Sequence, residues 1–134
     1  MSTNNFTKKI TIKSVLSFIG IGSIGLPIVK NLVNAGFQLK IFNRTPVIKK
    51  NIFLDGVEEF NSPSRATKDC DALLLCVSDD FAVEEVLFGS NGASLVLRPG
   101  TIVLDLSTIS PSKSRELASR LSSQGVIYID APVT

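Results

Sequence analysis

The sequence predicts an α/β domain built on a doubly wound parallel sheet, and three observations support this fold class. Short apolar runs alternate with segments whose apolar residues recur at helical spacing. Glycine, or a serine-proline pair, stands where several of these segments begin or end. The chain has 134 residues, which is enough for one domain with a hydrophobic core. The repeated succession of strand, helix and strand favours parallel pairing, right-handed crossovers and helices on both faces of the sheet.

The expected strands are short, mainly apolar runs, and such runs are typical of parallel strands that are buried on both faces. The first run is bounded by Gly20, and a brief third strand is closed by Phe60. We expect no internal repeat and no low-complexity segment. Apart from that brief strand, the expected strands in chain order are 15–19, 39–42, 72–77, 101–106 and 126–129.

The expected helices carry start and stop signals. The first has apolar residues at helical spacing and ends before Gly36. Ser-Pro pairs begin two later helices, because serine caps a helix and proline suits its first turn. Acidic residues begin another. The segment 47–54 is ambiguous and is interpreted as a short helix. In chain order the expected helices are 23–35, 47–54, 62–68, 79–88 and 110–124.

Charge and cysteine content restrict the class of protein. Residues 1–54 hold eight basic and no acidic residues, whereas residues 55–134 hold six basic and twelve acidic ones. A basic half suits a phosphorylated small molecule, nucleic acid or an acidic membrane. Two cysteines and no histidine exclude a zinc motif and a disulfide framework. We expect a cytoplasmic protein without a membrane span, a flexible segment at residues 1–13 and one domain over 14–134.

Residues 20–25 read G-x-G-x-x-G between a predicted strand and a predicted helix. In this context the pattern indicates a dinucleotide-binding, or Rossmann, turn. Gly20 permits the tight turn, Gly22 lets a pyrophosphate approach the backbone, and Gly25 lets helix and strand pack closely. The phosphates would sit on the free amides at Ser23 to Leu26, at the positive end of the helix, and Ile21 and Ile24 are predicted cofactor-binding residues of the same turn. The alternative is that these glycines only make a sharp turn.

Arg44 stands where such a fold commonly has an acid that binds the adenosine ribose hydroxyls. Asn43, Arg44 and Thr45 follow the second strand, and no acid precedes Asp55. A guanidinium and a hydroxyl suit a phosphate on the ribose 2′ position, and no carboxylate would repel it. The sequence therefore predicts NADP(H) as the cofactor in preference to NAD(H). The alternative is that Arg44 is a solvated loop residue.

With these residues the chain resembles the N-terminal domain of the β-hydroxyacid dehydrogenases, a family that includes 3-hydroxyisobutyrate dehydrogenase and the glyoxylate/succinic semialdehyde reductases. The resemblance covers residues 14–134 and rests first on 18–27, with Ile24 where the family usually has methionine. It implies that Val77 and Ser78 pass near the cofactor and that Thr108 sits by the nicotinamide ribose. It also implies substrate contacts for Ser107 and for Thr134, which stands in place of the family's serine.

Ser107 and Thr108 have an alternative role in helix capping and turn hydrogen bonding. The predicted fold places both residues where a ligand would bind. Ligands of parallel sheets bind beyond the carboxyl ends of the strands, and Gly20, Asn43 and Val77 also follow predicted strands there. We expect these residues to line one edge of the sheet.

The resemblance implies a proton-transfer lysine in a helical domain beyond this segment, so we expect no catalytic residue in this chain. Lys113 is expected on the surface of the last helix and is no substitute. The only tyrosine, Tyr128, lacks the lysine that a Tyr-x-x-x-Lys enzyme needs. The chain is interpreted as the cofactor half of an oxidoreductase acting on a small hydroxy acid or semialdehyde. It would bind cofactor without turnover and form a homo-oligomer only with the further domain.

Two other function classes stay open from the residues alone. One is a non-enzymatic nucleotide-sensing or scaffold module that keeps the fold without the catalysis. The other is nucleic-acid binding by the basic half, which predicts salt-sensitive retention on DNA. Aromatic residues are few, at 7%, and no motif that reads bases is visible, so we expect no nucleic-acid partner. No metal site is expected either.

Overall fold

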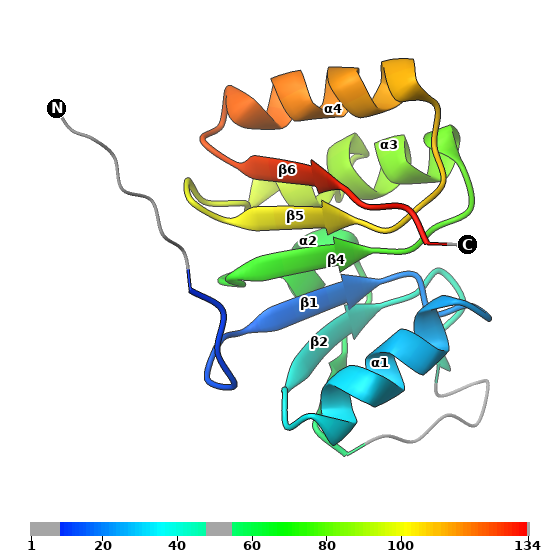
Figure 1. The fold of residues 1–134 in the computed structure, drawn as a ribbon, viewed down its shortest axis with the longest axis vertical. Coiled ribbons are helices and arrows are strands. Elements are labelled where there is room, and N and C mark those ends of the chain that lie inside the picture. Colours follow the sequence, from blue (N-terminus) through cyan, green and yellow to red (C-terminus); the bar gives the residue numbers. More distant parts are fainter. Residues whose placement is uncertain (1–8, 48–54, 134) are drawn as a thin grey trace, which may run out of the picture.

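The computed structural model describes residues 9–47 and 55–133. Within them, six parallel strands form one sheet in the order β3-β2-β1-β4-β5-β6 (Figure 1). This order places β1 and β4 side by side at the centre, where the direction of winding reverses. The predicted doubly wound α/β fold is therefore confirmed. The strands are β1 (Leu16–Ile19), β2 (Leu39–Phe42), β3 (Val57–Glu59), β4 (Ala72–Leu75), β5 (Ile102–Asp105) and β6 (Ile127–Asp130).

The helices agree with the sequence-based expectation in position and are shorter at their ends. They are α1 (Gly25–Asn34), α2 (Pro63–Thr67), α3 (Asp80–Phe88) and α4 (Pro111–Ser122), and a short 3₁₀ helix, η2 (Ala93–Leu95), was not predicted. The predicted helix at 47–54 lies outside the described residues except for Val47. The predicted domain boundary between residues 13 and 14 stays a prediction. Residues 11–14 form a hydrogen-bonded turn at this position.

Side-chain caps fix where three of the helices begin. Ser62, Asp79 and Ser110 each accept a hydrogen bond from the backbone amide three residues later. Such caps satisfy amides that the helix itself leaves unpaired. Helix α1 differs, because Ile24 precedes it and offers no side-chain cap. The amino end of α1 therefore keeps its amides available.

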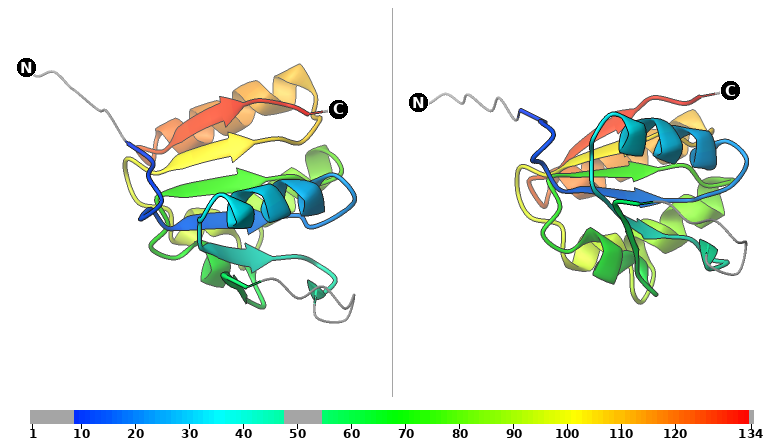
Figure 2. Two further views of the ribbon diagram at one scale, coloured as in Figure 1. Left: turned by 60° about the horizontal axis from the view of Figure 1, so that its bottom comes forward. Right: turned by 90° about the horizontal axis from the view of Figure 1, so that it is seen from below.

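The helices cover the two faces of the sheet unequally, as Figure 2 shows. Helix α1 packs on one face of the sheet, and Phe18 and Val29 belong to the hydrophobic cluster on that face. Helices α3 and α4 pack on the other face, where Leu117 and Leu121 are fully buried. Helix α2 lies on this second face too, and the buried hydroxyl of Ser17 donates a hydrogen bond to the carbonyl of Ala66. The sheet is thus packed against α1 on one face and against α2, α3 and α4 on the other.

The edge strand β6 lies far from α1 and remains uncovered on that face. Ile127 and Ile129 point to this side with 40% and 44% of their surface exposed. A sheet of this class usually carries helices on both faces. An exposed apolar strip is therefore present on this side of β6.

Candidate functional site

The carboxyl ends of the strands meet at one edge of the sheet, as predicted. Parallel pairing aligns Ile19 with Phe42 and with Leu75, and aligns Leu75 with Asp105. The residues that follow each strand continue the ladder: the amide of Gly20 donates to Phe42, and that of Leu106 donates to Leu75. The structure thus brings the predicted site residues 20–25, 43–45, 77–78 and 107–108 to the same edge. Thr134 lies outside the described residues.

The three glycines of the turn after β1 differ in what surrounds them. Gly20 has φ +104°, and a Cβ there would lie 2.0 Å from the carbonyl oxygen of Cys76. A Cβ on Gly25 would lie 2.0 Å from the carbonyl oxygen of Gly20. A Cβ on Gly22 would meet no atom within 4 Å. Gly20 and Gly25 are therefore required by the fold, whereas Gly22 leaves its backbone open to an approaching group.

The start of α1 offers unpaired hydrogen-bond donors next to this opening. The amides of Gly22, Ser23, Ile24 and Gly25 make no hydrogen bond to any residue in the described ranges. Ser23 and Ile24 are also exposed, with Ile24 at 49%. Unpaired amides at a helix amino end, with the positive end of the helix dipole, suit an anion such as a phosphate. These residues therefore fit the pyrophosphate that the glycine pattern predicts.

Ile21 and Asn43 join the turn after β1 to the loop after β2. The side chain of Ile21 is buried, and its amide donates to Oδ1 of Asn43 at 2.8 Å. Nδ2 of Asn43 donates to the carbonyl of Thr45 at 2.7 Å. Both polar atoms of the Asn43 amide group are therefore used within the protein. In this structure Asn43 and Ile21 shape the edge, and neither presents a free side-chain polar group.

Arg44 and Thr45 are exposed on the loop after β2. Arg44 forms no ion pair with another described residue, since every described ion pair involves other side chains. The guanidinium is therefore available to an anionic ligand. Thr45 lies beside it, with its carbonyl held by Asn43.

Glu59 is an acid near this loop that the chain order does not reveal. It stands at the end of β3, and its Oε2 accepts a hydrogen bond from the amide of Val47 at 2.8 Å. The carboxylate therefore anchors the far end of the loop that carries Arg44. Sequence analysis missed this role, because β3 is short and Glu59 lies twelve residues from Val47.

The loops after β4 and β5 are tied together by a buried hydroxyl. Oγ of Ser107 accepts a hydrogen bond from the amide of Val77 at 2.9 Å, and Ser107 is only 2% exposed. Its own amide donates to Oδ1 of Asp105. The neighbours Ser78 and Thr108 are exposed. The structure thus gives Ser107 a role in holding the edge, and leaves Ser78 and Thr108 open to a ligand. Their predicted contacts stay predictions.

Two side chains near the hydrogen bond between Val77 and Ser107 have raised pKa values. Burial raises the pKa of the Cys76 thiol, and the nearby Asp105 carboxylate raises it further. Burial also raises the pKa of Tyr128, together with its hydrogen bond to Asp105. Cys76 therefore stays a thiol and Tyr128 a phenol at neutral pH, so neither acts as an anionic nucleophile or base there.

Asp80 joins the start of α3 to the start of α4. Its Oδ1 accepts from the amide of Ser110 at 2.9 Å, and its Oδ2 accepts from the Ser110 hydroxyl at 2.6 Å. These hydrogen bonds lower the pKa of Asp80. The carboxylate therefore ties together the two loops that carry Ser78 and Thr108. Because 30 residues separate Asp80 from Ser110, no local sequence pattern indicates this contact.

We expect the contribution of Asp80 to stability to disappear in acid. The pKa of Asp80 is lower in the folded chain than in the unfolded one, where an aspartate titrates near pH ~3.9. The stabilisation is therefore present above that pH and is lost as the pH falls through the folded-state value. Asp80→Asn should lower the urea midpoint at pH 7, and the difference from the wild type should shrink towards pH 3. Exposed Glu85→Gln on the same helix is the control, and a difference independent of pH would contradict the assignment.

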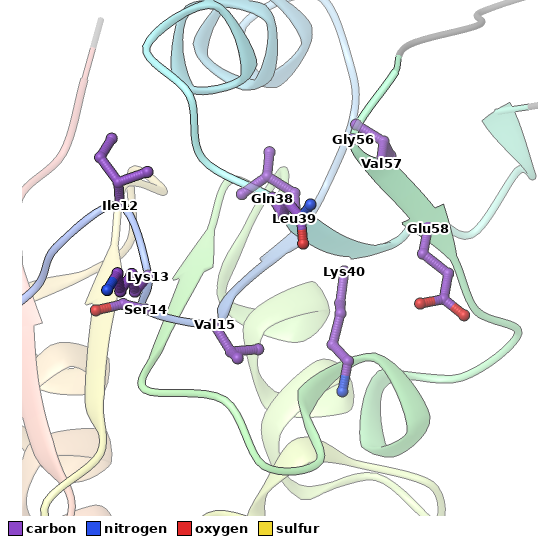
Figure 3. Close-up of a pocket in the computed structure, with 10 residues that line it drawn as sticks. All are labelled: Ile12, Lys13, Ser14, Val15, Gln38, Leu39, Lys40, Gly56, Val57 and Glu58. Atoms are coloured by element: carbon purple, nitrogen blue, oxygen red, sulfur yellow. The ribbon is translucent and has the colours of Figure 1, made fainter.

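A hollow lies at the opposite, amino-terminal edge of the sheet (Figure 3). Its volume is about 430 Å³, and it lies between the segment before β1 and the starts of β2 and β3. Lys40 and Glu58 line it from paired positions on those two strands. It shares no residue with the glycine turn or with the loops that follow the strands. The edge formed by the carboxyl ends of the strands and this hollow are separate features.

Among the described residues, no group of three or more His, Cys, Asp or Glu side chains is arranged to hold a metal ion. None of the helices in the described part of the chain has the length and apolar character that crossing a membrane would need.

A family model described as the NAD binding domain of 6-phosphogluconate dehydrogenase matches residues 15–134. Mouse mitochondrial 3-hydroxyisobutyrate dehydrogenase is 32% identical over 122 residues, which are 91% of this chain and 36% of the mouse protein. The chain belongs to the β-hydroxyacid dehydrogenase family. It contains the family's NAD-binding domain, and the resemblance seen in the sequence is confirmed. Other members of the β-hydroxyacid dehydrogenase family and their structures agree with this.

The 2-hydroxy-3-oxopropionate reductase of Escherichia coli is 36% identical over 119 residues, covering 89% of this chain and 40% of that protein. The structure of Mycobacterium tuberculosis 3-hydroxyisobutyrate dehydrogenase with L-serine has a TM-score of 0.80 and 29% identity. It covers 90% of this chain and 40% of that one. An imine reductase from Myxococcus stipitatus in complex with NADP+ has a TM-score of 0.73 and 25% identity, over 87% of this chain and 39% of that one. The chain thus spans about two fifths of these β-hydroxyacid dehydrogenase-like proteins.

Proposed function

We propose that this chain binds NADP(H) in preference to NAD(H), as the cofactor half of an oxidoreductase. The whole protein would transfer hydride between the nicotinamide and the carbonyl carbon of a small 3-hydroxy acid or semialdehyde. The relatives named above act as dehydrogenases and reductases, which supports the reaction class. A cytoplasmic location remains a prediction, since the mouse relative is named as mitochondrial.

The open backbone at Gly22 is the observation that carries this proposal. A pyrophosphate fits where a Cβ would meet no atom within 4 Å and where four neighbouring amides are unpaired in the described structure. Gly20 and Gly25 hold the turn in the conformation that exposes this space. The loop after β2 lies one strand further from the centre of the sheet, and this position supports a role for Arg44 at the adenosine half of a bound dinucleotide.

Arg44 is proposed to hold the 2′-phosphate of NADP(H). An arginine–phosphate pair is a charge-assisted contact of about 1.5–3 kcal/mol, or roughly tenfold to a hundredfold in affinity. The nearest acid identified at this loop, Glu59, has Oε2 engaged by the amide of Val47. The loop thus offers a cation to the extra phosphate, and the acid beside it already has a partner.

Bound nicotinamide supplies the hydride, and the described side chains offer no evident group for the accompanying proton. Lys113 is held in ion pairs with Glu84 and Glu116, and its pKa is raised by the hydrogen bond to Glu84. It is 16% exposed, so it is more enclosed than the surface position expected from the sequence. The Tyr128 hydroxyl donates a hydrogen bond to Oδ2 of Asp105 and is therefore already engaged. We therefore propose that the chain alone binds cofactor without turnover.

Calorimetric titration of the 134-residue chain with NADPH and with NADH tests the proposal. We expect NADPH to bind at least tenfold more tightly, because only NADPH carries the phosphate that Arg44 would pair. Equal affinities would contradict the preference, and no heat with either dinucleotide would contradict the function. A parallel assay with NADPH and a small semialdehyde should show no oxidation of NADPH, and steady turnover would contradict the last part of the proposal.

The non-enzymatic alternative rests on the same lack of an evident proton donor in the described residues. A nucleotide sensor needs the open Gly22 turn and no catalysis. The full-length protein discriminates between the two, since reduction of a semialdehyde by it indicates an enzyme. Cofactor binding without any turnover in the full-length protein would favour the sensor.

A further inference from the structure

Asp105 is a buried acid at the end of β5 that sequence analysis assigned no role. It is fully buried, with 0% of its surface exposed. Its Oδ1 accepts a hydrogen bond from the amide of Ser107 at 3.0 Å, and its Oδ2 accepts one from the hydroxyl of Tyr128 at 2.6 Å. Burying a carboxyl group is costly unless it is hydrogen-bonded, and the two hydrogen bonds to Asp105 offset part of that cost.

The contacts of Asp105 extend to three strands of the sheet. Tyr128 belongs to β6, and Asp105 itself ends β5. Ser107 passes the connection on, because its hydroxyl accepts from the amide of Val77 after β4. The chain of contacts therefore runs from β6 through β5 to the loop after β4. Each link is buried or half-buried, and each carboxylate oxygen has one donor.

The network lies on the side of the sheet over which the nicotinamide half of a dinucleotide would extend. In the strand order, β2 with Arg44 lies on one side of β1, and β4, β5 and β6 lie on the other. A cofactor with its pyrophosphate at the β1 turn and its 2′-phosphate at Arg44 must extend its nicotinamide half over β4 and β5. Ser78 and Thr108 are exposed there, and each directly follows a residue of the network.

We propose that Asp105 is a positioning residue for the nicotinamide half of the cofactor. It fixes the Ser107 backbone, and through the Ser107 hydroxyl it fixes the Val77 amide, so that Thr108 and Ser78 stand at defined positions. Asp105 is buried and acts through these neighbours. This inference rests on the proposed function, because it assumes that a dinucleotide binds across the edge.

Asp105→Asn tests the proposal, because it keeps the shape of the side chain and replaces one acceptor oxygen with a donor NH₂. That NH₂ would face the amide of Ser107 or the hydroxyl of Tyr128. The two probes are NADPH and 2′,5′-ADP, which has both phosphates of the adenosine half and no nicotinamide. We expect about a tenfold loss in affinity for NADPH and a change of less than about twofold for 2′,5′-ADP, measured by calorimetry.

Two further measurements separate positioning from general destabilisation. The fluorescence emission of bound NADPH reports the surroundings of the nicotinamide, and in Asp105→Asn at saturating ligand it should shift towards that of the free cofactor. Asp55→Asn is the matched control, since it removes the same charge from an exposed turn before β3, at the opposite edge. It should leave both affinities unchanged.

Tyr128→Phe decides the matter if Asp105→Asn does not fold. It removes one donor to the carboxylate and leaves the Ser107 contact in place. A smaller loss for NADPH, again without loss for 2′,5′-ADP, would support the proposal. Equal losses for the two ligands, or no loss for either, in the variants that fold would overturn it. A wild-type chain that binds neither ligand would instead overturn the proposed function.

Discussion

Gly25→Ala is expected to lower the free energy of unfolding by about 1–3 kcal/mol or more. The new Cβ would lie 2.0 Å from the carbonyl oxygen of Gly20 and 3.3 Å from Cε1 of Phe18, which is fully buried. Alanine favours a helix over glycine by about 1 kcal/mol, so the clash must exceed this gain. It does, because the nearest atom belongs to the backbone of a tight turn. Urea denaturation followed by circular dichroism measures the change.

Gly22→Ala is the matched control in the same turn. Its Cβ would meet no atom within 4 Å, so the stability should change by no more than about 0.5 kcal/mol. The methyl group would occupy the space proposed for the pyrophosphate, so the affinity for NADPH should fall sharply while the fold persists. Equal destabilisation by the two substitutions would contradict the distinction between a packing glycine and a binding glycine.

Arg44→Ala is expected to weaken NADPH binding by roughly tenfold to a hundredfold, which corresponds to about 1.5–3 kcal/mol. NADH has no 2′-phosphate, so its affinity should change by less than about twofold. Arg44 is exposed and has no ion-pair partner among the described residues, so its loss should leave stability nearly unchanged. Calorimetry with both cofactors gives the two ratios.

Lys30→Ala is the control for the loss of a positive charge. Lys30 is an exposed residue of α1, in the same basic half of the chain. General attraction between the basic half and a more highly charged ligand would make both substitutions weaken NADPH alike. Equal losses for NADPH and NADH in Arg44→Ala would show that Arg44 does not read the 2′-phosphate.

The fold could be predicted because its signals are local. Most of the expected strands among the described residues are short, mainly apolar runs, and Ser62, Asp79 and Ser110 cap helices where their sequence context indicates. The parallel pairing then brings the strand ends to one edge without further information. The helix η2 was missed, since it lacks a side-chain cap.

The internal hydrogen bonds of the site could not be predicted from the sequence. Asp80, Asp105 and Glu59 look like ordinary surface acids in the chain order, and their partners are set by tertiary packing. Ser107 was predicted as a substrate residue, and the structure shows it buried with its hydroxyl accepting from Val77. The predicted contacts of Arg44, Thr45, Ser78 and Thr108 with cofactor stay predictions, because exposure allows them without requiring them.

The double engagement of Asn43 limits how the proposed coenzyme preference of this chain can be re-engineered. A designer would place an acid at the end of β2 to favour the unphosphorylated ribose. Asn43→Asp keeps an acceptor for the amide of Ile21 and removes the donor that holds the carbonyl of Thr45. The exchange would therefore loosen the segment that it was meant to retune, and a compensating donor would have to be supplied from elsewhere.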